Sequence, residues 1–204
     1  MEKKAETDKR LFRKEALKKR DLLSLKYRER ASEEIAERLI HHKAYLSAEN
    51  IFLYYPVKSE VLLSLFTERC LKDGKKIYYP LSITGNGRNR LEFFEVEDPY
   101  TDLKPGYMGI PEPDKSRLVP FDGEPDLILV PGVCFDESLN RMGYGKGFYD
   151  GHLKGRGGIR AGLCFEELLY ELIPHDEGDE KMDMVITEKR IISDGQRISD
   201  NTRE

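Results

Sequence analysis

A run of alternating glycines flanked by basic side chains is the part of the sequence best suited to chemistry. Residues 141–150 read RMGYGKGFYD, with glycine at every second position from Gly143 to Gly147. Glycine has no Cβ atom, so the backbone N–H groups of this stretch can approach a ligand closely. Together with Arg141 and Lys146, these amides would form a binding site for phosphate or another polyanion. A flexible surface turn is the alternative, because tight turns also need glycine.

Two better-known phosphate-binding loops do not match this stretch. A Walker loop requires a hydroxyl residue after its lysine, whereas Gly147 follows Lys146. The dinucleotide fingerprint requires GxGxxG directly after a strand, whereas the glycines here are spaced GxGxG. They also come well after the apolar run 127–130, which predicts a strand buried on both faces, as in a parallel sheet. The loop is therefore neither of those two.

Length and composition narrow the class of protein. The 204 residues, 35% charged and 39% hydrophobic, predict one globular domain over 1–204. A net charge of −4 argues against nucleic acid or an anionic membrane as partner, and no apolar run approaches the roughly 18 residues of a membrane span. The first ten residues lack the apolar core of a secretory signal. Three widely spaced cysteines indicate a reduced, cytoplasmic protein without a zinc cluster.

The stretch 130–150, VPGVCFDESLNRMGYGKGFYD, resembles the signature of the 5-formyltetrahydrofolate cyclo-ligases, also called 5,10-methenyltetrahydrofolate synthetases. In that family PGxxFD followed by RxGxGxG[FY]YD forms the nucleotide and folate site. The resemblance covers about residues 9–188 and implies Arg141 and Lys146 as the catalytic residues. It implies ATP binding by the whole loop: Arg141, Met142, Gly143, Tyr144, Gly145, Lys146, Gly147, Phe148 and Tyr149.

The N-terminal segment carries further basic residues. Residues 5–23 contain good helix formers and neither Gly nor Pro, so a helix is expected there. Lys9 and Arg13 are four apart and therefore neighbours on that helix. A solvated basic face is one interpretation. The resemblance favours the other, because the family begins with K-x-x-[LF]-R, whose basic residues contact ATP phosphates; here these are Lys9, Arg10 and Arg13.

A loop after the first expected strand is the candidate folate site. Residues 51–55 predict a strand, and Ser59 would cap a helix that runs through Cys70. The loop between them lies at a strand's carboxyl end, where open α/β sheets bind ligands. A glutamate there usually only compensates the helix dipole. The resemblance instead implies pterin contacts by Glu60, with Tyr55 beside it, by Met108 in place of the bulky ring of relatives, and by Tyr144, Gly145, Lys146, Gly147 and Phe148 of the glycine loop.

Two acids are candidate metal ligands. The ending 181–188, KMDMVITE, is similar to the family's last motif. The resemblance makes Asp150 and Asp183 candidates for holding the cofactor Mg²⁺ beside the phosphates of ATP, because Mg²⁺ needs only one or two carboxylates besides substrate oxygens. Each aspartate alone would more commonly be a helix cap or a surface acid.

Helical and strand patterns alternate along the chain. Helices are expected at 24–46, with Ile35, Leu39 and Leu46 on the buried side and His41 and His42 on the surface, and at 148–154. Further strands are expected at 75–79, 91–96 and 159–165, with a polar turn at 85–89. This order predicts an α/β protein, and the resemblance implies a three-layer sandwich around a mostly parallel, doubly wound sheet.

The implied reaction is the ATP- and Mg²⁺-dependent cyclisation of 5-formyltetrahydrofolate to 5,10-methenyltetrahydrofolate, with release of ADP and phosphate. The expected partners are ATP and the folate, with or without a polyglutamate chain, and a monomer is expected. Two other classes stay open at this point. One is a nucleotide-binding module without turnover, which the retained Arg141, Lys146, Asp150 and Asp183 argue against. The other is an isomerase or transferase for phosphorylated sugars on a similar scaffold, because fold does not fix function.

Overall fold

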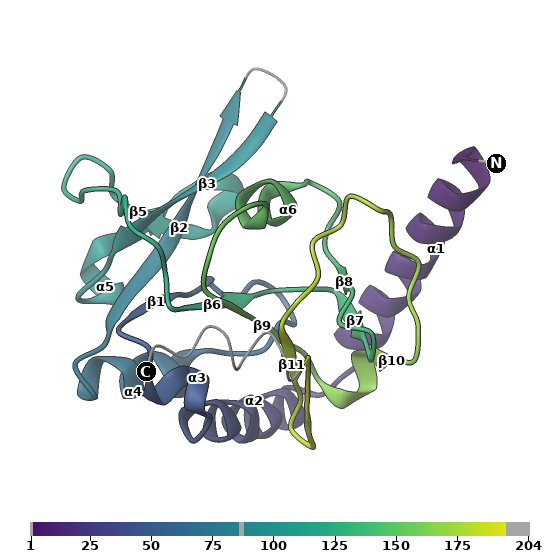
Figure 1. Cartoon of the computed structure of the whole chain (residues 1–204), viewed down its shortest axis with the longest axis horizontal. Helices are drawn as coiled ribbons and strands as arrows, with labels where there is room; N and C mark the ends of the chain where they lie inside the picture. Colours follow the sequence, from purple (N-terminus) through teal and green to yellow (C-terminus); the bar gives the residue numbers. More distant parts are fainter. Residues whose placement is uncertain (1, 86–87, 195–204) are drawn as a thin grey trace.

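The computed structural model describes residues 2–85 and 88–194. Its centre is a seven-stranded sheet (Figure 1). In sheet order the strands are β12 (Ile191–Ser193), β11 (Met184–Ile186), β9 (Ile159–Leu163), β6 (Leu127–Val130), β1 (Asn50–Phe52), β2 (Lys76–Gly85) and β3 (Arg88–Glu95). All neighbouring pairs are parallel except those that involve the edge strands β12 and β3. The expected mostly parallel sheet is confirmed.

Helices cover both faces of this sheet. They are α1 (Glu2–Asp21), α2 (Leu25–Ile40), α3 (Lys43–Leu46), α4 (Ser64–Lys72), α5 (Pro99–Asp102) and α6 (Phe148–Leu153), with short 3-10 turns at Tyr107–Gly109 and Glu166–Leu168. In Figure 1, α2, α3 and α4 lie below the sheet and α6 lies above it. Because α4 connects β1 to β2 and α6 connects β6 to β9, the sheet is wound on both sides, as expected.

Two small sheets extend the edge where the carboxyl ends of the parallel strands lie. They comprise β7 (Cys134–Asp136), β8 (Arg141–Met142) and β10 (Leu169–Tyr170), and β4 (Leu103–Pro105) with β5 (Pro111–Pro113). The antiparallel pair β7–β8 follows β6 and leads directly into the glycine run. Helix α1 packs beside the sheet of β7, β8 and β10, where the Phe12 ring lies 5.0 Å from that of Tyr170 in β10. The N-terminal helix is thereby brought to the glycine loop.

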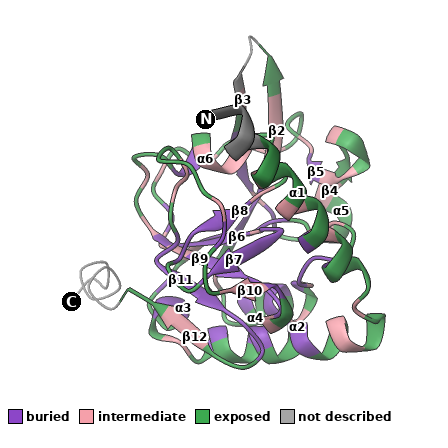
Figure 2. Ribbon diagram, turned by 90° about the vertical axis from the view of Figure 1, so that its right-hand side faces the viewer, coloured by how far each residue is buried: buried purple, intermediate pink, exposed green. Residues whose placement is uncertain are grey.

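Burial explains why β6 is a central strand of the sheet. All four residues of β6 are completely buried, which fits a continuous apolar run in a strand covered on both faces. Next to it, the Phe52 ring of β1 stacks on Phe93 of β3 with centroids 4.0 Å apart. Figure 2 shows the buried strands at the centre and the exposed outer faces of α1 and α2 around them. Each such large apolar side chain stabilises the fold by about 1.5–3 kcal/mol.

The helix expected at 24–46 is two helices. His42 breaks it: its backbone is extended, and its Nδ1 accepts a hydrogen bond at 3.2 Å from the Ala44 N–H as the N-cap of α3. The chain changes direction there, so Leu46, expected on the buried side, is 62% exposed. Ile35 and Leu39 are buried as expected.

The helix expected from Ser59 begins later, at Ser64. The Ser59 hydroxyl donates to Asp21 and accepts from the Nε of Arg20 at 3.0 Å, so it is not available to cap a helix. The strand before it also ends at Phe52 rather than at Tyr55. Glu60 is therefore a buried residue within a loop, not at a helix start. In the described part of the chain, no helix combines the length and the apolar character needed to cross a membrane.

Candidate active site

The candidate site is built at the carboxyl ends of two parallel strands, β1 and β6, together with the glycine loop. The loop 53–60 follows β1, Pro131 and Gly132 follow β6, and the glycine loop 143–147 lies between β8 and α6. Parallel strands end at the same edge of a sheet, which is where α/β proteins bind ligands. The structure thus brings the predicted nucleotide loop and the predicted folate loop to one edge.

The glycine loop is held in place from two sides. Gly145 and Gly147 have positive φ angles of 78° and 70°, which residues with a Cβ rarely adopt. The Gly143 carbonyl accepts a hydrogen bond at 2.8 Å from Nε of Arg13 on α1. On the other side, Asn89 of β3 donates to the Lys146 carbonyl at 2.8 Å. The loop is therefore a fixed structure rather than a loose surface turn.

Arg141 is buried beneath the glycine loop. Its guanidinium donates to Asp150 Oδ1 at 2.7 Å and to the Pro131 carbonyl at 3.3 Å, and it lies 5.6 Å from the Tyr149 ring. Its Nε has no hydrogen-bond partner among the described residues. Arg141 thus joins the end of β6 to α6, and its Nε–H stays unused among the described residues.

The other residues of the loop differ in how far their side chains are exposed to solvent. Lys146 is exposed, and its ammonium forms no ion pair with any residue in the described part of the chain. Met142, also a predicted ATP contact, is buried in the core, and its carbonyl accepts from the Val133 N–H at 2.7 Å. Its side chain therefore faces away from any bound ATP. Phe148 is half-buried, with its ring 5.7 Å from that of Tyr107.

The three basic residues of α1 have different positions. Arg13 is joined to the glycine loop, whereas Arg10 is exposed. Lys9 forms ion pairs with Asp176 at 2.7 Å and Asp179 at 2.6 Å. Burial opposes the charge on Lys9, but the two carboxylates outweigh it and raise the pKa of Lys9. A phosphate would therefore have to replace carboxylates at Lys9.

Glu60 is a buried carboxylate on the folate side of the site. Its Oε2 accepts from the Val57 N–H at 2.9 Å. Burial raises the pKa of Glu60, and the Val57 N–H, the charge of Arg20 and a hydrogen bond with Tyr144 partly offset this effect. A buried carboxylate of this kind favours ligands that offer N–H donors. The structure brings Glu60 and Tyr144 together, as the shared folate site requires.

The two remaining predicted folate contacts are on the surface. Tyr55 is 39% exposed, next to the Glu60 loop. Met108 is 81% exposed and has a φ of 53°, an uncommon backbone conformation for a residue with a side chain. It follows Tyr107, whose ring contacts Phe148 of the glycine loop. Both side chains are therefore free to contact a ligand at this edge.

Arg20, near the end of α1, was missed by the sequence analysis. It is only 2% exposed, and it donates to Ser59 Oγ at 3.0 Å, to the Gly132 carbonyl at 2.8 Å and to the Tyr144 hydroxyl at 2.5 Å. The sequence offered one indication that Arg20 is buried: it lies four residues after Ala16, so the two residues share one face of the helix, and both are buried. That signal was hidden among the exposed basic residues around it.

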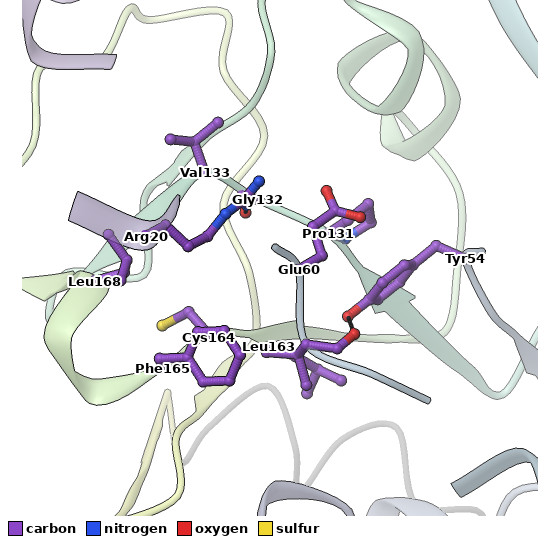
Figure 3. Close-up of a pocket in the computed structure, with 11 residues that line it drawn as sticks. Arg20, Tyr54, Glu60, Pro131, Gly132, Val133, Leu163, Cys164, Phe165 and Leu168 are labelled. Atoms are coloured by element: carbon purple, nitrogen blue, oxygen red, sulfur yellow. Dashed lines mark hydrogen bonds between the residues drawn. The ribbon is translucent and has the colours of Figure 1, made fainter. Parts of the chain in front are cut away.

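A small cavity lies between these groups (Figure 3). Its volume is about 10 Å³, which is room for about one water molecule. Arg20 and Glu60 both line it, Gly132 lies between them in this view, and Pro131 lies beside Glu60. Its apolar wall is formed by Val133, Leu163, Cys164, Phe165 and Leu168. A bicyclic ring does not fit in this volume.

The structure does not bring the two predicted metal ligands together. Asp150 lies at the carboxyl edge of the sheet, where Arg141 binds it. Asp183 precedes β11, at the opposite end of the parallel strands, and its Oδ2 accepts from the Arg160 N–H at 2.8 Å. No group of three potential ligand side chains occurs within residues 2–85 and 88–194. These residues do not fit a joint magnesium site.

Comparisons with known proteins identify the family of the chain. Residues 5–188 match the profile of the 5-formyltetrahydrofolate cyclo-ligase family. The chain is 30% identical over 174 residues to a probable 5-formyltetrahydrofolate cyclo-ligase of Schizosaccharomyces pombe, covering 78% of this chain and 84% of that protein. It is 29% identical over 191 residues to the Mus musculus 5-formyltetrahydrofolate cyclo-ligase, covering 88% and 93%.

A solved structure extends the likeness to the fold. The NMR structure of Aquifex aeolicus 5,10-methenyltetrahydrofolate synthetase superimposes with a TM-score of 0.80 at 34% sequence identity, covering 92% of this chain and 94% of that one. The family match includes α1, the Glu60 loop and the glycine loop. The interpretation as a phosphosugar isomerase therefore has no support. The chain belongs to the 5-formyltetrahydrofolate cyclo-ligase family.

Proposed function

We propose that this protein uses ATP and Mg²⁺ to close 5-formyltetrahydrofolate to 5,10-methenyltetrahydrofolate, with release of ADP and phosphate. One observation carries the proposal beyond family membership. The basic glycine loop, with Arg13 and Lys146, lies at the same sheet edge as the buried carboxylate of Glu60. A polyanion site and a site for N–H donors are thus adjacent, as a reaction between ATP and a reduced pterin requires.

The chemistry explains why these two sites must adjoin. The N5-formyl group is an amide, so its carbon is a poor electrophile and its oxygen a poor leaving group. Transfer of the γ-phosphoryl from ATP to the formyl oxygen releases ADP and gives an iminium phosphate. N10 then attacks the activated carbon, and phosphate departs with the former formyl oxygen and the C–O bonding electrons. Loss of the N10 proton completes the methenyl bridge.

The protein's contribution is positioning and charge. Phosphoryl transfer needs reactants in line and positive charge near the transferring group. Lys146 is exposed and forms no ion pair with the residues that the structure describes, so it supplies that charge, and Arg13 fixes the loop that carries it. Arg141 is fixed against Asp150 and orients the start of the loop. Glu60 accepts from the pterin N–H groups. No protein nucleophile is required.

Mg²⁺ is expected to enter with ATP, bound to the phosphate oxygens. Because Asp150 and Asp183 lie apart, they cannot hold it jointly, and no step is assigned to a metal held by both. Binding through one carboxylate and substrate oxygens would still satisfy magnesium. The three cysteines are buried free thiols, which supports the proposed reducing, cytoplasmic location.

The test is an absorbance assay for methenyltetrahydrofolate with the purified chain. We expect conversion of 5-formyltetrahydrofolate only when ATP and Mg²⁺ are both present, with one ADP formed per product. Omission of ATP, and separately addition of a chelator, are the controls. Turnover that persists without ATP and metal would rule out the proposed reaction, and binding of both substrates without turnover would indicate a non-catalytic module.

A further inference from the structure

Arg20 brings a buried positive charge into the site, and the reaction above gives it no role. Burying a cation is costly unless its donors are satisfied. Its hydrogen bonds to Ser59, Gly132 and Tyr144 all go to neutral oxygens. Burial raises the pKa of the nearby Glu60 carboxyl, and the Arg20 charge offsets part of that rise. A side chain that serves only packing would not need a charge in this place.

The three acceptors belong to three different segments. Ser59 precedes Glu60 in the folate loop, Gly132 follows β6, and Tyr144 belongs to the glycine loop. A guanidinium is planar and rigid, so the bonds that it donates fix these segments relative to one another. We infer that Arg20 is a positioning residue that couples the folate site to the nucleotide site, an inference that rests on the proposed function.

Tyr144 connects the glycine loop to the folate side of the site. The Tyr144 hydroxyl accepts from Arg20 at 2.5 Å and also hydrogen-bonds with Glu60. The cavity beside Glu60 has a volume of only about 10 Å³, so a pterin ring can reach this carboxylate only if groups around it move. Tyr144 is the contact of Arg20 and Glu60 that belongs to the glycine loop. Because Tyr144 lies between Gly143 and Gly145, a displacement of the glycine-loop backbone also displaces the Tyr144 hydroxyl.

Nucleotide binding acts on the same loop. Phosphates bound to the loop amides and to Lys146 would shift the balance of contacts that hold Tyr144 on Arg20. A bound nucleotide that favours the released position of Tyr144 therefore favours folate binding, and by linkage the folate favours the nucleotide equally. Couplings between sites typically change affinity by about 5–150-fold.

The experiment is calorimetric titration of 5-formyltetrahydrofolate into the full chain, with and without a non-hydrolysable ATP analogue and Mg²⁺. For the wild-type chain we expect the analogue to tighten folate binding about tenfold, within the usual range of such couplings. Arg20→Lys keeps the charge but loses the fork, so the ratio of the two folate affinities should fall to about threefold or less.

Two further variants separate coupling from stability. Tyr144→Phe removes the hydroxyl and leaves the buried charge intact, so folate alone should bind a few-fold more tightly and the ratio should fall. Tyr45→Phe is the matched control, because it removes a tyrosine hydroxyl that donates to Asp73 at 2.7 Å, at the amino end of the sheet. It should leave the ratio unchanged.

Each outcome bears on the inference. A wild-type ratio of one with both ligands bound would overturn the coupling and leave the proposed function standing. Ratios that stay equal to wild type in folded Arg20→Lys and Tyr144→Phe would overturn the role of Arg20. If Arg20→Lys does not fold, the Tyr144→Phe ratio decides. Failure of the wild-type chain to bind either ligand would overturn both proposals.

Discussion

Some residues of the glycine-loop signature are exposed and can contact a ligand, whereas others are buried and stabilise the structure. Lys146 projects into solvent and forms no ion pair with the described residues, whereas Arg141 is buried and bonded to Asp150. Cys134, in the same signature, is completely buried, and burial raises the pKa of its thiol to about 12. It is therefore protonated at neutral pH and cannot act as a thiolate nucleophile.

This contrast predicts how two substitutions in the signature differ. Lys146→Ala removes a positive charge from the transferring phosphoryl group, so kcat/KM should fall by about 10²-fold or more, as for comparable donors. Cys134→Ser changes only a core contact and should keep activity within a few-fold. Steady-state kinetics on samples matched for folded fraction provide the measurement. Equal losses in the two variants would show that Lys146 has no special part in the chemistry.

The family motif predicted which residues belong to the site better than it predicted the contacts that each residue makes. Arg13, Lys146 and Glu60 come to one edge because their strand-end and helix positions follow from local pattern. Arg20 could not be found in this way, since its partners lie up to 124 positions away and its neighbours in sequence are exposed bases. Asp183 was assigned through a motif, but the direction of its strand places it at the far end.

At the scale of elements, the turn from β7 to β8 sets the start of the glycine loop. Asp136 is completely buried and accepts hydrogen bonds from the N–H groups of Ser138, Asn140 and Ile173 and from the Asn140 amide. Leu139 in this turn has a φ of 67°, which is unfavourable for leucine. The Asp136 bonds therefore stabilise a turn that the local sequence does not favour.

We expect Asp136→Asn to destabilise the fold by about 1–3 kcal/mol, because one oxygen that accepts hydrogen bonds becomes a donor facing N–H groups. The measurement is the free energy of unfolding in urea. Asp122→Asn is the matched control, since Asp122 is exposed, and it should change stability by less than about 0.5 kcal/mol. A loss no greater than that of the control would mean that the turn does not depend on this carboxylate.

Element boundaries were the weakest part of the sequence prediction. The apolar spacing of 24–46 continues across His42, so periodicity alone could not reveal that its ring caps a second helix. Similarly, Ser59 has the composition of an N-cap but is used by Arg20. In both cases a side chain had two possible hydrogen-bond partners, and the tertiary structure decided between them.

At the scale of the whole molecule, alternation of helix and strand was enough to predict the layered, mostly parallel sheet. Strand order was not predictable. Strand β1 lies next to both β2 and β6, and its pairing with β6 depends on contacts between residues more than 70 positions apart. Among these contacts are the hydrogen bonds from the N–H groups of Glu49 and Asn50 to Asp126. Such long-range pairings leave no local pattern in sequence.

One buried histidine makes the stability of the folded protein depend on pH. His152 of α6 packs against the rings of Phe93 and Phe52, with centroids 4.7 and 6.0 Å away, and its Nε2 has no partner among the described residues. Burial, with the nearby charge of Arg156, lowers the pKa of His152 from 6.5 to about 4. The folded protein therefore keeps this ring neutral at pH values where the unfolded chain protonates it.

The sign of the pH effect follows from linkage. The unfolded state binds the extra proton as pH falls below 6.5, so stability is full above 6.5 and decreases down to about pH 4, by at most about 3 kcal/mol. His152→Phe keeps an aromatic ring but does not titrate. Urea unfolding from pH 8 to pH 4 should show a smaller loss for this variant than for wild type. Parallel curves would exclude His152 as the source.

The position of α1 has a consequence for synthesis. The arginines of this helix are made before the carbonyls that they bind, at Gly132 and Gly143, which follow 112 and 130 residues later. At about 5–20 residues per second, the helix waits on the order of 10 s for its partners. During that time Arg13 and Arg20 remain hydrated. The active site is thus assembled only after the ribosome has passed the glycine loop, and a nascent chain cannot engage ATP and folate together before then.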